Sequence, residues 1–294
     1  MSLVEILQQL INGLSLGSVY ALIALGYTMV YGIIGLINFA HCDIYMVGAY
    51  IGLFASINLH LPFIPTLLIA MVGSAIAGVL VERIAYKPLR KASNIALLIT
   101  AMGVSLLLEN TFNAIFGAAQ RSYPHDILAQ KTIAIGPVHT DSLHLIILLT
   151  SVVLMLLLQI IIYKTKIGKA MRATSADKDA AALMGINVDA TISATFAIGS
   201  ALAGAAGVLV GILYNSVEPY MGIQPGIKAF TAAVFGGIGL IPGAFLGGLV
   251  LGVIETFVTA WYSPLSHAIG FIVLIVILII KPSGLLGKKV SEKV

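Results

Sequence analysis

Three polar side chains interrupt an otherwise apolar stretch and are the first candidates for chemistry. Asn38, His41 and Asp43 fall within six residues of one another. A metal site would need further ligands, and the sequence places none nearby. A proton relay would need a chain of ionisable groups, whereas Glu109 and Glu255 are scattered along the sequence. Two interpretations remain open. The three side chains contact a transported substrate, or they hydrogen-bond one another and nearby backbone to hold a broken helix.

A second candidate is the glycine-rich run GGIGLIPG at Gly236–Gly243, inside the apolar segment Gly226–Ala260. Its glycines and proline predict a helix break, with a short half-helix before it and a longer helix after it. Within a membrane, non-helical backbone is tolerated only where protein or a water-filled cavity covers it, and broken helices often mark a transport pathway. A plain loop between two tilted helices is the alternative. The candidate pathway residues are therefore Asn38, His41, Asp43, Gly236, Gly237 and Gly239.

The longest polar interruption, Lys164–Asp189, is the third candidate and holds five of the 16 basic residues. Its second half predicts a short helix that is capped by Ser175 and ended by Gly185 in the left-handed conformation. Such a helix of about two and a half turns is unstable alone in water, so its small apolar face needs a partner. A docking surface is the functional hypothesis, and an ordinary basic connection between two spans is the alternative. The residues concerned are Asp177, Asp179, Ala180, Ala181, Leu183, Met184 and Gly185.

Composition places all three candidates in a membrane protein. The 294 residues are 59% hydrophobic and only 10% charged, with a mean hydropathy of +1.05, whereas soluble domains carry about 25% charged residues. Thirteen of the 16 basic residues form three clusters, Arg83–Lys91, Lys164–Lys178 and Lys281–Lys293. The polar segments Ala118–Asp141 and Tyr214–Pro225 contain few Lys or Arg. The positive-inside rule therefore makes the clusters and the C-terminus cytoplasmic and the two segments external.

Counting the crossings between these segments predicts an all-α polytopic membrane protein. We expect a single transmembrane domain over residues 1–294, about eight transmembrane helices and an external N-terminus. Residues 226–260 must enter the membrane and return, which makes them the broken or re-entrant segment. Cys42 is the only cysteine, so no internal disulfide can form. No nucleotide-binding loop, nucleophile elbow or zinc signature occurs, so we expect no enzyme, no catalytic residue, no metal and no cofactor.

Several stretches resemble one known family. Asp179-Ala180-Ala181 followed by Gly185 resembles the EAA loop of ABC-importer permeases, with Asp in place of the usual Glu. Four longer stretches resemble, in the same order, the hydrophobic permease subunits of bacterial branched-chain amino acid ABC importers. They are GLINFAHCDIYMVGAY (Gly35–Tyr50), DAAALMGINV (Asp179–Val188), ALAGAAGVLVG (Ala201–Gly211) and GIKAFTAAVFGGIGLIPGAFLGGLVLGVIE (Gly226–Glu255). The family usually has glycine where this chain has Cys42, so we expect the close approach of backbones there to differ.

The resemblance implies one half of a pore in the bacterial inner membrane, moving branched-chain or related amino acids with ATP that a partner hydrolyses. Besides the lipid bilayer, the implied partners are a second related permease, two cytoplasmic ATPase subunits and an external or periplasmic solute-binding protein. The segment 164–189 would then be the ATPase-coupling loop. No nucleic-acid partner is expected. Two alternatives stay open, an ion-coupled secondary transporter with its site at the broken helix and a non-transporting membrane anchor, and the amino acid or amide carried is also left open.

Overall fold

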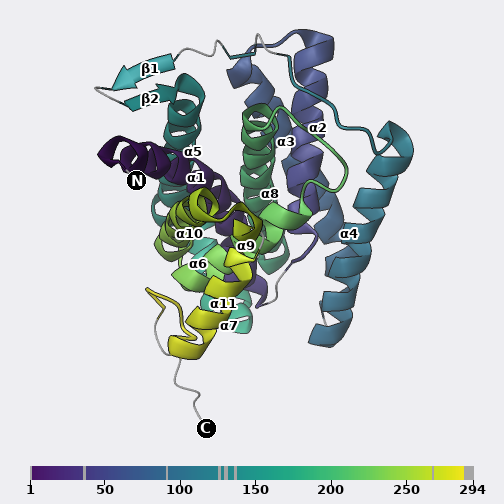
Figure 1. Ribbon diagram of the computed structural model, residues 1–294. Coiled ribbons are helices and arrows are strands. Elements are labelled where there is room, and N and C mark those ends of the chain that lie inside the picture. Colours follow the sequence, from purple (N-terminus) through teal and green to yellow (C-terminus); the bar gives the residue numbers. More distant parts are fainter. Residues whose placement is uncertain are drawn as a thin grey trace.

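The computed structural model describes residues 2–35, 38–90, 92–124, 127–128, 132–135, 138–266 and 268–287. Helices form one bundle, with a small β-hairpin at its top in the view of Figure 1. In chain order the elements are α1 Leu3–Ile34, α2 His41–Leu59, α3 Phe63–Val81, a π-helical turn Glu82–Tyr86, a 3-10 turn Lys87–Leu89, α4 Asn94–Phe116, β1 Thr132–Ile135, β2 Val138–Asp141, α5 Ser142–Lys164, α6 Lys166–Ala176, α7 Lys178–Leu183, α8 Val188–Leu213, α9 Ile223–Gly236, α10 Ile241–Trp261, a 3-10 turn Ser263–Ser266 and α11 Ile269–Ile280.

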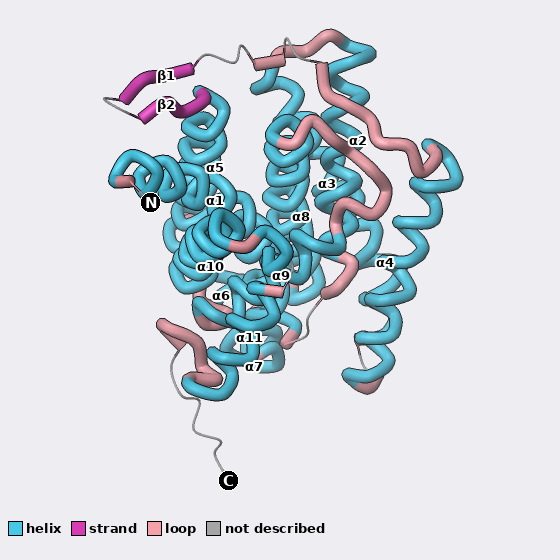
Figure 2. Tube along the Cα trace, viewed as in Figure 1, coloured by secondary structure: helices cyan, strands magenta, loops and turns pink. Residues whose placement is uncertain are grey.

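The lengths and composition of these helices confirm the polytopic membrane fold. Among the described residues, seven helices are long and apolar enough to cross a membrane: α1, α2, α3 with the turns that extend it, α4, α5, α8 and α10. The apolar helix α11, with 12 residues, is an eighth and shorter candidate. The antiparallel hairpin β1–β2 was not expected from the sequence. It pairs Thr132 with Asp141 within the segment predicted to be an external loop (Figure 2).

Glycines let the central helices pack at backbone contact. A Cβ built on Gly17 of α1 would lie 2.7 Å from the Cα of Leu249 in α10, and Gly252 meets the backbone of Gly17 in return. A Cβ built on Gly48 of α2 would lie 2.3 Å from the Cα of Gly204 in α8, and one built on Gly204 would meet Ser74 and Ala70 of α3. Lipid supplies no hydrophobic force between helices, so small residues that permit close van der Waals contact hold them together. As a result, α1 and α8 form the buried centre of the bundle.

The predicted helix break is present. The half-helix α9 ends at Gly236, and α10 begins at Ile241. Between them, Gly237 and Gly239 have φ angles of 107° and 90°, which are accessible to glycine at little cost. The amide of Leu285 donates to the carbonyl of Phe235 at 2.8 Å, so the chain after α11 covers the end of the half-helix.

The three basic clusters meet at one end of the bundle. Lys87 forms an ion pair of 2.9 Å with Asp189, which joins the first cluster to the end of the coupling segment. Ser175, within the second cluster, donates to the carbonyl of Gly32. Gly32 in turn lies next to Gly239, at the helix break that the segment after α11 covers. We call this the basic end. The basic residues of these clusters that lie outside the described residues are Lys91, Lys288, Lys289 and Lys293.

The two polar segments that were predicted to be external lie together at the other end. Arg121 and Val217 exchange backbone hydrogen bonds of 3.0 and 2.8 Å. The Tyr123 hydroxyl donates to the carbonyl of Ala49, which ties the same loop to α2. We call this the loop end. The structure thus places the basic clusters and the two polar segments at opposite ends of the bundle, as the charge asymmetry of the sequence predicted. Figure 1 shows α7 and α11 low in the bundle, opposite the hairpin.

Candidate functional site

The coupling segment forms two short helices at the basic end. Thr165 caps α6 by accepting from the amide of Gly168. The Asp177 carboxylate caps α7 by accepting from the amides of Asp179 and Ala180, each at 2.9 Å. The predicted cap, Ser175, was wrong: it lies inside α6 because that helix continues to Ala176. The chain turns only at Asp177, where the backbone is extended, so the aspartate is the side chain placed to cap the next helix.

The end of α7 is a Schellman motif. The amide of Gly185 donates to the carbonyl of Ala182, and the amide of Ile186 donates to the carbonyl of Ala181, each at 3.0 Å. Gly185 has a φ angle of 81°, as predicted, and no atom lies within 4 Å of a Cβ built on it. The strain of any other residue at this position would therefore come from the backbone alone.

Side chains on α7 divide between the bundle and the surface. Leu183 and Met184 are 88% and 83% exposed, although both are large and apolar. Asp177, Asp179 and Ala180 are exposed as well. In contrast, Ala181 is buried within this chain and only 4% exposed. The predicted docking residues are therefore exposed at the basic end, with the exception of Ala181, which packs α7 onto the rest of the bundle.

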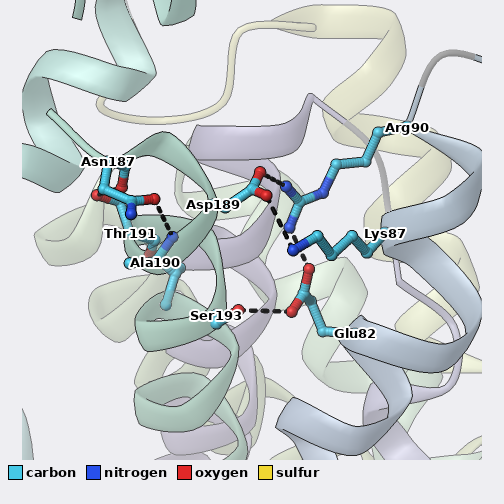
Figure 3. Close-up of polar contacts among 9 residues, drawn as sticks. Glu82, Lys87, Arg90, Asn187, Asp189, Ala190, Thr191 and Ser193 are labelled. Atoms are coloured by element: carbon cyan, nitrogen blue, oxygen red, sulfur yellow. Dashed lines mark hydrogen bonds and ion pairs between the residues drawn. The ribbon is translucent and has the colours of Figure 1, made fainter. Parts of the chain in front are cut away.

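A polar network anchors the coupling segment to the first basic cluster (Figure 3). Arg90 bridges two carboxylates, the fully buried Glu82 and the half-exposed Asp189 at the start of α8. Lys87 adds a second contact to Asp189, and the Ser193 hydroxyl donates to Glu82 at 2.7 Å. The sequence analysis missed this network. Its only signal was an acidic residue at the edge of each polar segment, and the pairing spans 99 residues for Arg90 and Asp189.

Asn38, His41 and Asp43 are all buried. The backbone amide of His41 donates to the carbonyl of Asn38 at 3.1 Å, but among the described residues no hydrogen bond joins two of the three side chains. Asn38 accepts a hydrogen bond of 2.5 Å from the hydroxyl of Tyr86. The His41 ring meets the Tyr27 ring edge to face, with centroids 5.0 Å apart. These contacts extend to three different neighbours rather than forming one polar cluster.

Asp43 makes the third of these contacts, across α2 to α4. Its carboxyl group faces Ser105 and Glu109 of that helix. His41 begins α2, so the predicted break lies just before it. In the described residues, Asn38, His41 and Asp43 each keep one polar atom without a hydrogen-bond partner. Both interpretations of this run, substrate contact and support of a broken helix, remain predictions.

The two groups of candidate pathway residues lie along the same helix. Gly26 of α1 faces His41, and Gly32, six residues further on, faces Gly239. Six residues of α-helix correspond to about 9 Å. Helix α1 therefore contacts both groups of candidate pathway residues, the polar residues 38–43 and the glycine break at the basic end.

The structure contains a buried ion pair near the loop end that the sequence analysis did not find. Lys228 of α9 and Glu255 of α10 are joined by a contact of 2.6 Å between Nζ and Oε1. Both residues are less than 8% exposed. The sequence analysis described Glu255 only as a scattered charge and did not consider Lys228 as its partner. A signal was present, since a hairpin that turns at Gly236–Gly243 brings residue 228 opposite the last turns of α10.

Known proteins resemble this chain over nearly its whole length. Residues 9–280 match the family described as "Branched-chain amino acid transport system / permease component". The chain is 42% identical to the high-affinity branched-chain amino acid transport system permease protein LivH of Salmonella typhimurium, over 98% of this chain and 97% of the relative. Identity is 41% to the corresponding protein BraD of Pseudomonas aeruginosa, over 98% of both chains. A probable permease of Methanocaldococcus jannaschii is 31% identical over 90% of this chain and 88% of its own.

A solved structure shares the architecture. PsaBC from Streptococcus pneumoniae, in complex with Fab, superposes with a TM-score of 0.50, covering 92% of this chain and 91% of that chain. At 15% identity this likeness concerns the fold alone. The family match, the identity to the permease proteins and the bundle of membrane-spanning helices agree with one another. The chain therefore belongs to the family of branched-chain amino acid transport system permease components.

Proposed function

We propose that this chain is the membrane-spanning permease subunit of an ABC importer that moves branched-chain or related amino acids into the cell. The observation that carries the proposal is the 42% identity, over 98% of the chain, to a permease protein of a high-affinity branched-chain amino acid transport system. Transport, rather than catalysis within this chain, is the activity proposed. The energy comes from ATP that is hydrolysed by a partner.

The packing of the bundle supports a pathway shared with a second subunit. Close glycine contacts between α1 and α10, and between α2 and α8, fill the centre of this chain with backbone. A substrate would have to separate these helices to pass between them. A path along the boundary with a second, related permease requires no such separation, so we propose a pair of permeases. Two ATPase subunits and an external solute-binding protein complete the proposed assembly.

The surface of α7 supports the proposed coupling to the ATPase. Leu183 and Met184 offer apolar area at the basic end, next to the capped and glycine-terminated ends of a short helix. Polar contacts connect the coupling segment to the bundle at two places. Ser175 connects α6 to the end of α1, and Asp189 connects α8 to the turns after α3. We propose that closure of the ATPase dimer moves α7 and that these contacts carry the movement to the spans.

The orientation follows from charge. Because cytoplasmic segments of membrane proteins are rich in Lys and Arg, we propose that the basic end and the C-terminus face the cytoplasm. The loop end then faces the side from which a binding protein delivers its cargo. A multi-pass protein of the inner membrane is the corresponding location.

Transport assays in proteoliposomes test the proposal. The complete assembly, reconstituted with its binding protein, should accumulate labelled leucine when ATP is present on the ATPase side. A non-hydrolysable ATP analogue should abolish uptake, and collapse of ion gradients should leave it unchanged. Uptake that follows an ion gradient without ATP would instead identify a secondary transporter.

A further inference from the structure

A cavity at the loop end is lined by the buried ion pair of Lys228 and Glu255. Its volume is about 490 Å³, within the range of roughly 300–1,000 Å³ typical of small-molecule sites. Tyr214, 60% exposed, lies at its rim. In the orientation proposed above, the cavity therefore opens on the external side, where the binding protein delivers its cargo.

The placement of the pair indicates a role other than stability. Both charges lose their hydration on burial, and well-packed apolar side chains of similar volume are often at least as stabilising as a buried ion pair. Ionisable residues within membrane-spanning segments commonly serve substrates or ions. Lys228 also packs its stem on α11, since a Cβ built on Gly270 would lie 3.4 Å from its Cγ. This packing holds the ammonium group at the wall of the cavity.

Each member of the pair keeps hydrogen-bonding capacity that the described residues do not fill. The Lys228 ammonium carries three N–H donors, and one hydrogen bond, to Oε1 of Glu255, is formed. The second carboxylate oxygen, Oε2, has no hydrogen-bond partner among the described residues. Tyr20 approaches this carboxylate without filling Oε2, and its ring lies 5.8 Å from the Lys228 ammonium. Lys228 and Glu255 thus line the cavity with side chains of opposite charge, and the unpartnered Oε2, which is buried in this state, becomes an acceptor for a ligand once the carboxylate turns toward the cavity.

We propose that this pair is a transient binding site for the zwitterionic main chain of an α-amino acid, an inference that rests on the proposed amino-acid transport. The substrate carboxylate accepts from the Lys228 ammonium, and the substrate ammonium donates to Oε2 of Glu255. The four charges sum to zero, so the cargo can lose its water without leaving a buried charge uncompensated. A decarboxylated or deaminated cargo leaves one charge unpaired. The site therefore selects the amino-acid class and leaves choice among side chains to other contacts.

The double variant Lys228→Met/Glu255→Leu separates this role from a structural one. It replaces the pair by apolar side chains, so membrane abundance and recovery of the ATPase should match the wild-type assembly. Leucine uptake should fall on the order of ten- to hundredfold, because charge-assisted hydrogen bonds to the cargo are lost. Undiminished uptake by an abundant, assembled double variant would overturn the proposal. If the wild-type assembly itself moves no amino acid, the proposed function fails first and this inference fails with it.

A binding measurement on the purified permease assembly, without the binding protein, gives a second readout. Leucine in large excess should raise the Tm of the wild-type assembly, since a ligand that binds only the folded state stabilises it. At the same concentrations, 3-methylbutylamine and 4-methylpentanoate, which lack the carboxylate and the ammonium respectively, should leave the Tm unchanged. The double variant should show no shift with any of the three. Equal shifts with leucine and either analogue, or a leucine shift that survives in the double variant, would contradict a zwitterion site.

Discussion

Leu183 and Met184 allow the coupling proposal to be tested quantitatively. Burying a leucine or methionine side chain contributes about 1.5–3 kcal/mol relative to leaving it in water. With exposures of 88% and 83% in this chain, almost all of that gain remains available to a partner. Replacing both by serine therefore removes up to about 3–6 kcal/mol of docking energy. At about 1.4 kcal/mol for each factor of ten, the affinity for the ATPase should fall by roughly two to four orders of magnitude.

The assay is recovery of the ATPase with an affinity-tagged permease, together with leucine uptake. Membrane abundance of the Leu183→Ser/Met184→Ser variant should stay near wild type, because the two side chains contribute little to the fold. Trp261→Ser is the matched control, since Trp261 is also 88% exposed but ends α10 at the opposite end of the bundle. It should leave ATPase recovery intact. Normal recovery and normal uptake in the double serine variant would refute the reasoning and leave α7 as a mere connection.

Three further predictions follow from the basic end and the orientation. Gly185→Arg places a side chain at a φ angle of 81°, and this backbone strain costs about 1–2 kcal/mol at the end of α7. We expect leucine uptake to fall while membrane abundance stays normal. Gly185→Asn is the control and should stay near wild type, because asparagine tolerates this conformation. Arg90→Met leaves the fully buried carboxylate of Glu82 without its arginine, and the expected loss in the free energy of unfolding is about 3–5 kcal/mol. Lys87→Met breaks only a half-exposed ion pair, for which about 0–1 kcal/mol is expected. The Tm should therefore fall much further for Arg90→Met, and equal Tm values would contradict this. In a background without the native cysteine, an impermeant thiol reagent on intact cells should label Ser122→Cys but not Ser175→Cys, and the reverse pattern would invert the proposed orientation.

Local properties of the chain made much of the architecture predictable. A membrane-spanning helix must satisfy its own backbone hydrogen bonds within an apolar segment, so the spans appear directly as apolar blocks. The break at Gly236–Gly243 and the turn at Gly185 were predictable for a similar reason. Both depend on glycine reaching positive φ angles, which is a property of the residue itself.

Contacts between distant segments were not predictable in the same way. The Arg90–Asp189 contact depends on how α3 and α8 lie beside each other, and residue spacing carries no signal for a separation of 99 positions. The Ser175 cap was wrong because both Ser175 and Asp177 can cap a helix, and the choice depended on where α6 stopped. Asn38, His41 and Asp43 are near in sequence, yet they contact three different neighbours because successive side chains around a helix start point in different directions.

By itself, the sequence determined that this is a polytopic helical membrane protein, which segments share an end, where a helix breaks, and which family the chain resembles. The first three follow from composition, charge placement and the backbone freedom of glycine, whereas the family resemblance rests on the matching sequence stretches themselves. Only the tertiary structure decided that Ala181 is buried while Leu183 and Met184 are exposed, and that Lys228 meets Glu255 at the wall of a cavity. The physical reason is that burial and pairing depend on the distance and rotation between helices. Those quantities arise from the simultaneous packing of all the helices, here through the glycine contacts of α1, α2, α8 and α10.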